Sequence, residues 1–255
     1  MKGELVIGAI AGDILGSPYE RNAIYNPDVD LTDEQDFTDD SILTIATMEC
    51  MLDDSEEFEK YYMKWGRKFI GESIWGKNFF KWLHEGDCKA INHSWGNGCL
   101  MRISPIAYFP GTEEDCKRLA ILSCQYTHNC PESFLAAIEY VGYLYRLLHH
   151  IPVQGMTNNY EFYLNNPTGF DCSIKSVKQA YSSYIHGGSM GGDVVLNCIK
   201  SAIRLGGDTD TIGAMTGALA ETGFSVQNLT YLLGYLTEEM VGIVKEFSKK
   251  FNSME

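Results

Sequence analysis

Two short strings of acidic and hydroxyl side chains stand out as groups that could do chemistry. The first is Thr38-Asp39-Asp40, and the second, much further along the chain, is Asp208-Thr209-Asp210-Thr211. If the fold brings the four carboxylates together, their charges would raise one another's pKa values unless divalent cations compensate them. No Cys or His pair lies nearby in the sequence, which favours oxygen coordination of Mg²⁺, Mn²⁺ or Ca²⁺. The two strings therefore predict a binuclear metal site.

Each string also has a simpler interpretation as the start of a helix. Thr38 or Asp39 could be an N-cap that satisfies a free backbone amide, and for this string alone the capping role is favoured. Gly206-Gly207 could likewise end one helix before an Asp caps the next. One Asp suffices for a cap, however. The second acid and the two threonines of the Asp208 string therefore favour metal coordination.

Three other segments contribute candidate site residues. Asp13 adds a carboxylate, and Glu20 follows Pro18, which is predicted to end the first helix. Beside a metal site, Glu20 could position a water molecule or stabilise developing positive charge. Gly96-Asn97-Gly98 predicts a turn with left-handed residues and backbone amides directed at a ligand, although the pattern is equally typical of a tight turn. His128, taken alone, is more typical of a helix cap than of a catalyst.

The charge distribution argues against nucleic acid as a partner. The chain has a formal net charge of -14, and residues 22–59 are rich in Asp and Glu but contain no Lys, Arg or His. Such a surface would repel a phosphate backbone, whereas it suits a site loaded with cations. Solubility alone explains most of these charges. The string Asp53-Asp54-Ser55-Glu56-Glu57 has the form of a prenyl-diphosphate motif, but without a second motif or a basic clamp it predicts an acidic helix start.

The cysteines and the N-terminal stretch indicate a reduced, cytoplasmic protein. The eight cysteines include no C-x-x-C pair, which argues against a zinc knuckle or a thioredoxin motif. The apolar stretch near the N-terminus is interrupted by Asp13 and several glycines too early for a signal peptide or a membrane span. We therefore expect no membrane partner.

The elements that must position these groups are predicted to be helices. Helical periodicity dominates the sequence, so we expect an all-α protein in which residues 1–255 form one compact multi-helix domain. Gly8, Gly12 and Gly16 recur on one face of a predicted helix over residues 4–16, where they would let another backbone approach closely. Further helices are predicted over 40–52, 56–69, 79–84, from Thr112, over 131–150, briefly over 160–164, and over 174–184, 193–205, 211–222, 226–236 and 238–251.

Taken together and in order, five segments resemble the ADP-ribosylglycohydrolase family, and the resemblance extends from about residue 5 to residue 222. It implies an all-α fold with two Mg²⁺ ions, or Mn²⁺, at the bottom of a cleft that accepts ADP-ribose. The segments that carry it are residues 12–20, 37–40, Gly96-Asn97-Gly98 with Met101-Arg102, Thr127-His128 and 205–211.

The resemblance also implies roles for individual residues. Glu20 resembles a mobile glutamate near the scissile bond, and Asp39 and Asp210 would share the catalytic work. The implied substrate-binding residues are Gly96, Asn97, Gly98, Met101, Arg102 and His128. The implied metal ligands are Thr38, Asp39, Asp40, Asp208, Asp210 and Thr211.

The activity implied is hydrolysis of the α-glycosidic bond at C1″ of ADP-ribose. This reaction would release ADP-ribose from an N- or O-linked protein side chain or from a small acceptor. Two alternatives stay open at this point. The chain could be a non-catalytic relative that binds ADP-ribose or has a structural role, or a different all-α, Mg²⁺-dependent enzyme that acts on nucleotides or diphosphates.

Overall fold

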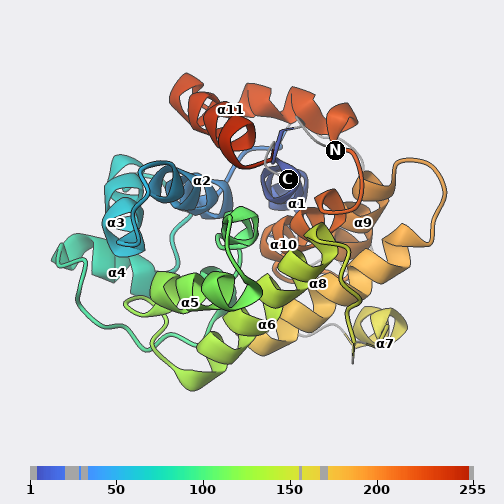
Figure 1. The fold of residues 1–255 in the computed structure, drawn as a ribbon, viewed down its shortest axis with the longest axis horizontal. Helices are drawn as coiled ribbons and strands as arrows, with labels where there is room; N and C mark the ends of the chain where they lie inside the picture. Colours follow the sequence, from blue (N-terminus) through green and yellow to red (C-terminus); the bar gives the residue numbers. More distant parts are fainter. Residues whose placement is uncertain (1–4, 21–28, 30–33, 155–156, 167–171, 253–255) are drawn as a thin grey trace.

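The computed structural model describes residues 5–20, 29, 34–154, 157–166 and 172–252 (Figure 1). Within these ranges the chain is helical and contains no β-strand, in agreement with the all-α prediction. The helices are α1 (Gly8–Glu20), α2 (Asp39–Leu52), α3 (Phe58–Lys68), α4 (Lys77–Glu85), α5 (Glu113–Cys124), α6 (Pro131–Leu148), α7 (Tyr160–Asn165), α8 (Ser173–Gly188), α9 (Val194–Arg204), α10 (Thr209–Glu221) and α11 (Glu238–Phe251), with 3-10 segments η1 (Asn97–Cys99), η2 (Ser104–Tyr108) and η3 (Gln227–Tyr235).

Helices α1 and α10 form a closely packed pair at the centre of the molecule (Figure 1). A Cβ atom added to Gly12 would lie only 2.0 Å from the carbonyl oxygen of Gly213, so the two backbones are in direct contact. At Gly16 an added Cβ would lie 2.7 Å from the Cα of Asp210. The glycine stripe predicted from the sequence is therefore confirmed as a contact face. It brings Asp210 against the last turns of α1.

The other helices surround this pair and make one compact domain. Helices α8 and α9 pack on α10, and α2 packs on α3 and α11. The C-terminal part of the chain returns to the N-terminal part: the backbone N–H of Val6 donates to Ser248 Oγ at 2.8 Å, and Lys250 Nζ donates to the carbonyl of Leu52 at 3.1 Å. No helix in the ranges described combines the length and the apolar character needed to cross a bilayer.

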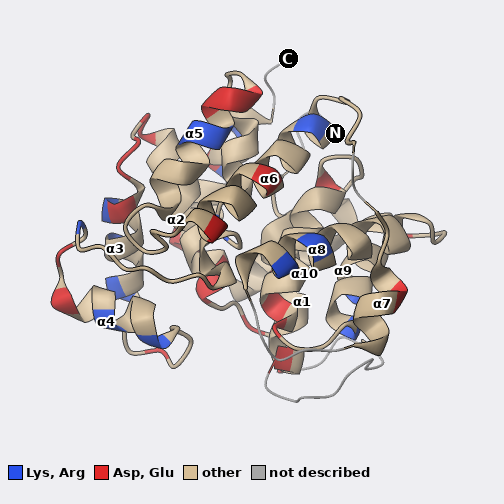
Figure 2. Ribbon diagram, turned by 90° about the horizontal axis from the view of Figure 1, so that it is seen from below, with Lys and Arg blue, Asp and Glu red and all other residues tan. Residues whose placement is uncertain are grey.

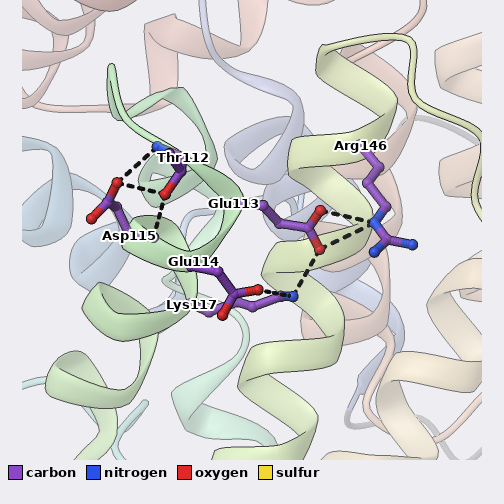
Figure 3. A network of polar contacts seen from close by, with 6 residues as sticks. All are labelled: Thr112, Glu113, Glu114, Asp115, Lys117 and Arg146. Carbon is purple, nitrogen blue, oxygen red and sulfur yellow. Dashed lines mark hydrogen bonds and ion pairs between the residues drawn. The ribbon is translucent and has the colours of Figure 1, made fainter.

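Helix α5 begins where the sequence predicted, and a polar network joins it to α6 (Figure 3). Thr112 Oγ1 accepts a hydrogen bond from the backbone of Asp115, whose carboxylate accepts one from the backbone of Thr112, so both amides are satisfied. Glu113 accepts from Arg146 Nε at 3.0 Å and pairs with Lys117 at 2.9 Å. This network fixes the start of α5 against α6.

The prediction that Pro18 ends the first helix is wrong. Helix α1 continues to Glu20 with Pro18 inside its last turn. Proline has no backbone N–H to offer the carbonyl of Ile14, but Ser17 Oγ donates to that carbonyl at 3.1 Å instead. Glu20 is consequently held at the end of a helix rather than in a loop. The predicted start of this helix at Glu4 lies outside the residues described.

Two other segments also differ from the predictions. The segment predicted as an α-helix over 226–236 is the 3-10 segment η3, and its buried residues Leu229 and Leu232 are three positions apart, as a three-residue turn requires. Helix α6 ends at Leu148 rather than His150, because His150 adopts a left-handed conformation with φ of 57°.

Candidate functional site

The two acidic strings meet at the facing N-termini of α2 and α10. Thr38 Oγ1 lies 3.4 Å from Asp210 Oδ2, and Thr211 Oγ1 donates to Asp40 Oδ2 at 3.3 Å. Acidic segments gather at this end of the α1–α10 pair (Figure 2). The predicted convergence of the strings is thus a property of the fold.

The carboxylates form two overlapping groups of three. Oxygen atoms of Asp13, Asp40 and Asp210 lie within 4.8 Å of one another, and so do oxygen atoms of Glu20, Asp208 and Asp210. Asp210 belongs to both groups. Asp39, a metal ligand implied by the resemblance, lies outside both groups, although burial and the charges of Asp13 and Asp208 raise its pKa.

Asp13 holds the start of α2 against α1. Its carboxylate accepts hydrogen bonds from the backbone N–H groups of Thr38 and Ser41, both at 3.0 Å, from Thr38 Oγ1 at 2.7 Å, and from Ser41 Oγ. Burial nevertheless outweighs these bonds and raises the pKa of Asp13 to about 6. From the sequence alone, Asp13 was only an additional acid. The signal was a carboxylate within an otherwise small and apolar helix.

The buried acids at the centre of the site are under strong electrostatic strain. Burial raises the pKa of Asp40 and of Asp210 well above the usual range, and neighbouring negative charges raise both further. Asp40 Oδ1 is buried and has no hydrogen-bond partner among the residues described. A buried oxygen without a partner is costly unless a cation or proton satisfies it. These carboxylate oxygens are therefore suitable ligands for a divalent metal ion of the Mg²⁺ class.

Helix capping does not account for the acids of α10. Asp208 occupies the N-cap position, yet its side chain makes no capping hydrogen bond. Instead, the Asp208 carboxylate accepts a hydrogen bond from the side chain of Asn97, with 2.6 Å between Nδ2 and Oδ2. At α2, Thr38 fills the capping role by accepting from the backbone of Asp40 at 3.3 Å, which leaves the carboxylate of Asp40 free of that role.

The Gly96-Asn97-Gly98 segment differs from the left-handed turn predicted for it. Gly96 has φ of -66°, and Asn97 begins the 3-10 segment η1. The turn is fixed by tertiary contacts, because Asn97 Nδ2 bonds both Asp208 and Ser176 Oγ, the latter at 3.1 Å. The left-handed glycines near the site are Gly206 and Gly207, with φ of 70° and 79°, in the turn that leads into α10.

The other residues that were predicted to bind substrate are buried. Met101 is buried, and its sulfur lies 3.9 Å from Thr211 Oγ1. His128 is buried beside Gly98. Arg102 is fully buried, and its guanidinium lies 3.9 Å above the ring of Tyr62. The structure therefore places Arg102 in the core rather than at the surface of the site.

Comparison with known families agrees with this geometry. The sequence profile of the ADP-ribosylglycohydrolases matches residues 4–222. The chain belongs to the ADP-ribosylglycohydrolase family. The matched region contains both acidic groups, the Gly96 turn and His128, whereas η3 and α11 lie beyond it. Membership supports a hydrolase that acts on ADP-ribose-related substrates and uses divalent metal ions.

A solved structure shares the fold of this family member. It is described as an ADP-ribosylglycohydrolase-related protein complex, and it superposes with a TM-score of 0.74 at 21% sequence identity, over 98% of this chain and 96% of that chain. Comparison with the sequences of curated proteins finds no significant match.

Proposed function

We propose that this protein hydrolyses the α-glycosidic bond at C1″ of ADP-ribose and releases ADP-ribose from an N- or O-linked protein side chain or small acceptor. The observation that carries the proposal is the pair of carboxylate groups that share Asp210, inside the region that matches the family. A non-catalytic relative would have no need of five acids that repel one another.

The reaction is an exchange of one bond for another. The oxygen of a water molecule bonds to C1″, the bond from C1″ to the acceptor breaks, and the acceptor takes up a proton, through a transition state with positive charge on the sugar ring. Glu20 is exposed at the end of α1 and lies within 4.8 Å of Asp208 and Asp210. We assign it to accepting the proton of the water and to stabilising the positive charge.

The proposed ligands of two divalent ions, Mg²⁺ or Mn²⁺, are the side chains of the two strings together with Asp13. Such ions, when bound, orient hydroxyl groups and lower the pKa of a coordinated water. Asn97 supports the site by orienting the Asp208 carboxylate. The ligands proposed are Asp13, Thr38, Asp39, Asp40, Asp208, Asp210 and Thr211.

The proposal is tested by an ADP-ribose release assay on a panel of arginine-, serine- and ester-linked substrates, with and without Mg²⁺. Asp210→Ala should abolish release and leave the protein folded. Asp54→Asn is the matched control, because Asp54 follows the opposite end of α2 and pairs at the surface with Lys250. It should keep full activity.

Each alternative has its own outcome in this assay. Binding of ADP-ribose without release from any substrate would identify a binding protein. Release of phosphate or pyrophosphate from nucleotides would identify a different hydrolase. Full activity of Asp210→Ala in the presence of a chelator would refute the assigned site.

A further inference from the structure

Arg102 is a buried cation whose contacts lead to His128. Its Nη2 donates to the carbonyl of Ser123 at 3.1 Å and to Thr127 Oγ1 at 2.6 Å. Its Nε and Nη1 are buried and find no hydrogen-bond partner among the residues described. The ring of Tyr62 offsets part of the cost of burying this charge. Because burying this cation is unfavourable, we infer that it has a specific role.

The hydroxyl of Thr127 links Arg102 to the imidazole of His128 through hydrogen bonds. A guanidinium can only donate, so Thr127 Oγ1 accepts from Arg102 and retains its own hydrogen to donate. His128 Nδ1 lies 3.0 Å from the same oxygen. No other acceptor for that hydroxyl hydrogen occurs among the residues described, so the hydrogen is directed to Nδ1. Nδ1 is then an acceptor, and the proton of the neutral ring resides on Nε2.

The ring stays neutral for two reasons. Burial lowers the pKa of His128 well below its usual value, and the positive charge of Arg102 lowers that pKa further. A protonated ring would also place a second N–H donor against the Thr127 hydroxyl, whose hydrogen would then have no acceptor. In the neutral ring with hydrogen on Nε2, the Thr127 hydroxyl has an acceptor and Nδ1 has a donor.

The Nε2 edge of the ring faces the turn at the acidic site. A Cβ atom added to Gly98 would lie 3.5 Å from both Cε1 and Nε2, so this edge of the ring lies directly against Gly98. Asn97, the neighbouring residue in the same turn, donates to Asp208. The imidazole is thereby presented beside the residues that hold the carboxylates.

We propose that Arg102 is a positioning residue that acts through Thr127 to fix His128 as a neutral donor at Nε2, and that this N–H binds an acceptor oxygen of the ligand. The ligand oxygen would be a hydroxyl or phosphate oxygen of ADP-ribose, and this second clause rests on the function proposed above. The tautomer of His128 does not depend on that proposed function. Arg102 contacts no ligand in this arrangement.

The tautomer can be measured directly, without substrate, by ¹⁵N NMR of protein labelled at its six histidines. Long-range ¹H–¹⁵N correlations distinguish hydrogen on Nε2 from hydrogen on Nδ1, and His128→Gln identifies the signals of His128. We expect the Nε2–H form in the unaltered protein and in Thr127→Ser, which keeps the hydroxyl. Thr127→Val, which has the same shape but no hydroxyl, should give a mixture with Nδ1–H.

The result that overturns the inference is an Nδ1–H ring in the unaltered protein, or a tautomer that Thr127→Val leaves unchanged. The comparison of Thr127→Val with Thr127→Ser tests the inference even if variants of the buried Arg102 fail to fold. In a second measurement, Thr127→Val should weaken ADP-ribose binding about tenfold, whereas Thr127→Ser should not. Equal affinities with the expected tautomers would refute the role of Nε2–H in binding. Absence of ADP-ribose release would refute the hydrolase proposal and leave the tautomer result intact.

Discussion

Thr38 Oγ1 lies 3.4 Å from Asp210 Oδ2, although 172 positions separate the two residues in the sequence. Thr38 caps α2, and Asp210 lies in the first turn of α10. The positive ends of two helix dipoles therefore point at one cluster of carboxylates and offset part of its charge. The packing of α1 on α10 keeps this arrangement in place.

Gly12→Ala should destabilise the protein severely. The added Cβ would lie 2.0 Å from the carbonyl oxygen of Gly213, and neither backbone can move without separating α1 from α10. We expect the free energy of unfolding in urea to fall by more than about 3 kcal/mol. Gly242→Ala is the control, because its Cβ on the exposed face of α11 would meet nothing within 4 Å. A Gly12→Ala protein as stable as this control would contradict the observed contact.

Glu20→Gln should separate catalysis from folding. The side chain is exposed, so the melting temperature should stay within about 1 °C of the unaltered protein. Loss of the carboxylate should reduce kcat at least about 100-fold, as expected for a group that transfers a proton. Glu85→Gln, an exposed glutamate paired with Lys81, is the control. Unchanged kcat in Glu20→Gln would remove Glu20 from the mechanism.

Glu221 predicts a pH dependence of stability that is independent of the acidic site. It is buried at the opposite end of α10, where Oε2 accepts from the backbone of Ile7 and Gly8, and burial raises its pKa from 4.5 to about 8. The folded protein thus binds this proton more tightly than the unfolded chain. Its contribution is fully present below pH 4.5 and is lost as the pH rises through about 8.

The test compares unfolding of the unaltered protein and Glu221→Gln between pH 5 and pH 8. Relative to the variant, the unaltered protein should lose stability with rising pH, with a limiting slope of about 1.4 kcal/mol per pH unit. Other groups titrate equally in both proteins and cancel in the difference. Two parallel stability curves would show that the Glu221 pKa is not raised.

The sequence predicted the helices well because their signals are local. Capping residues such as Thr112, apolar periodicity and the glycine spacing of α1 are all visible within a few positions of the chain. The meeting of the two acid-rich helix starts was a hypothesis that rested on the second carboxylate of the Asp208 string and on the resemblance to the family. The helices therefore needed no knowledge of tertiary contacts, whereas the meeting of the strings depended on the fold.

The features that could not be predicted depend on tertiary contacts. The turn at Gly96 is set by hydrogen bonds from Asn97 to two other helices, and the burial of Arg102 depends on where Tyr62 lies. Continuation of α1 through Pro18 required Ser17 to satisfy one carbonyl. Asp13 looked like one more acid until the fold placed four donors around it. No local pattern carries this information.

The central claim is that the acids form a metal site rather than a set of helix caps, and thermal unfolding of Asp40→Asn tests it most directly. Asp40 has a buried oxygen without a partner and a pKa raised by burial and neighbouring charge. With chelator present, Asp40→Asn should therefore melt at a higher temperature than the unaltered protein, because one repelling charge is gone. On addition of Mg²⁺ the unaltered protein should gain stability by binding, and the variant should gain much less. A variant that is destabilised with chelator and still gains as much from Mg²⁺ would contradict the account.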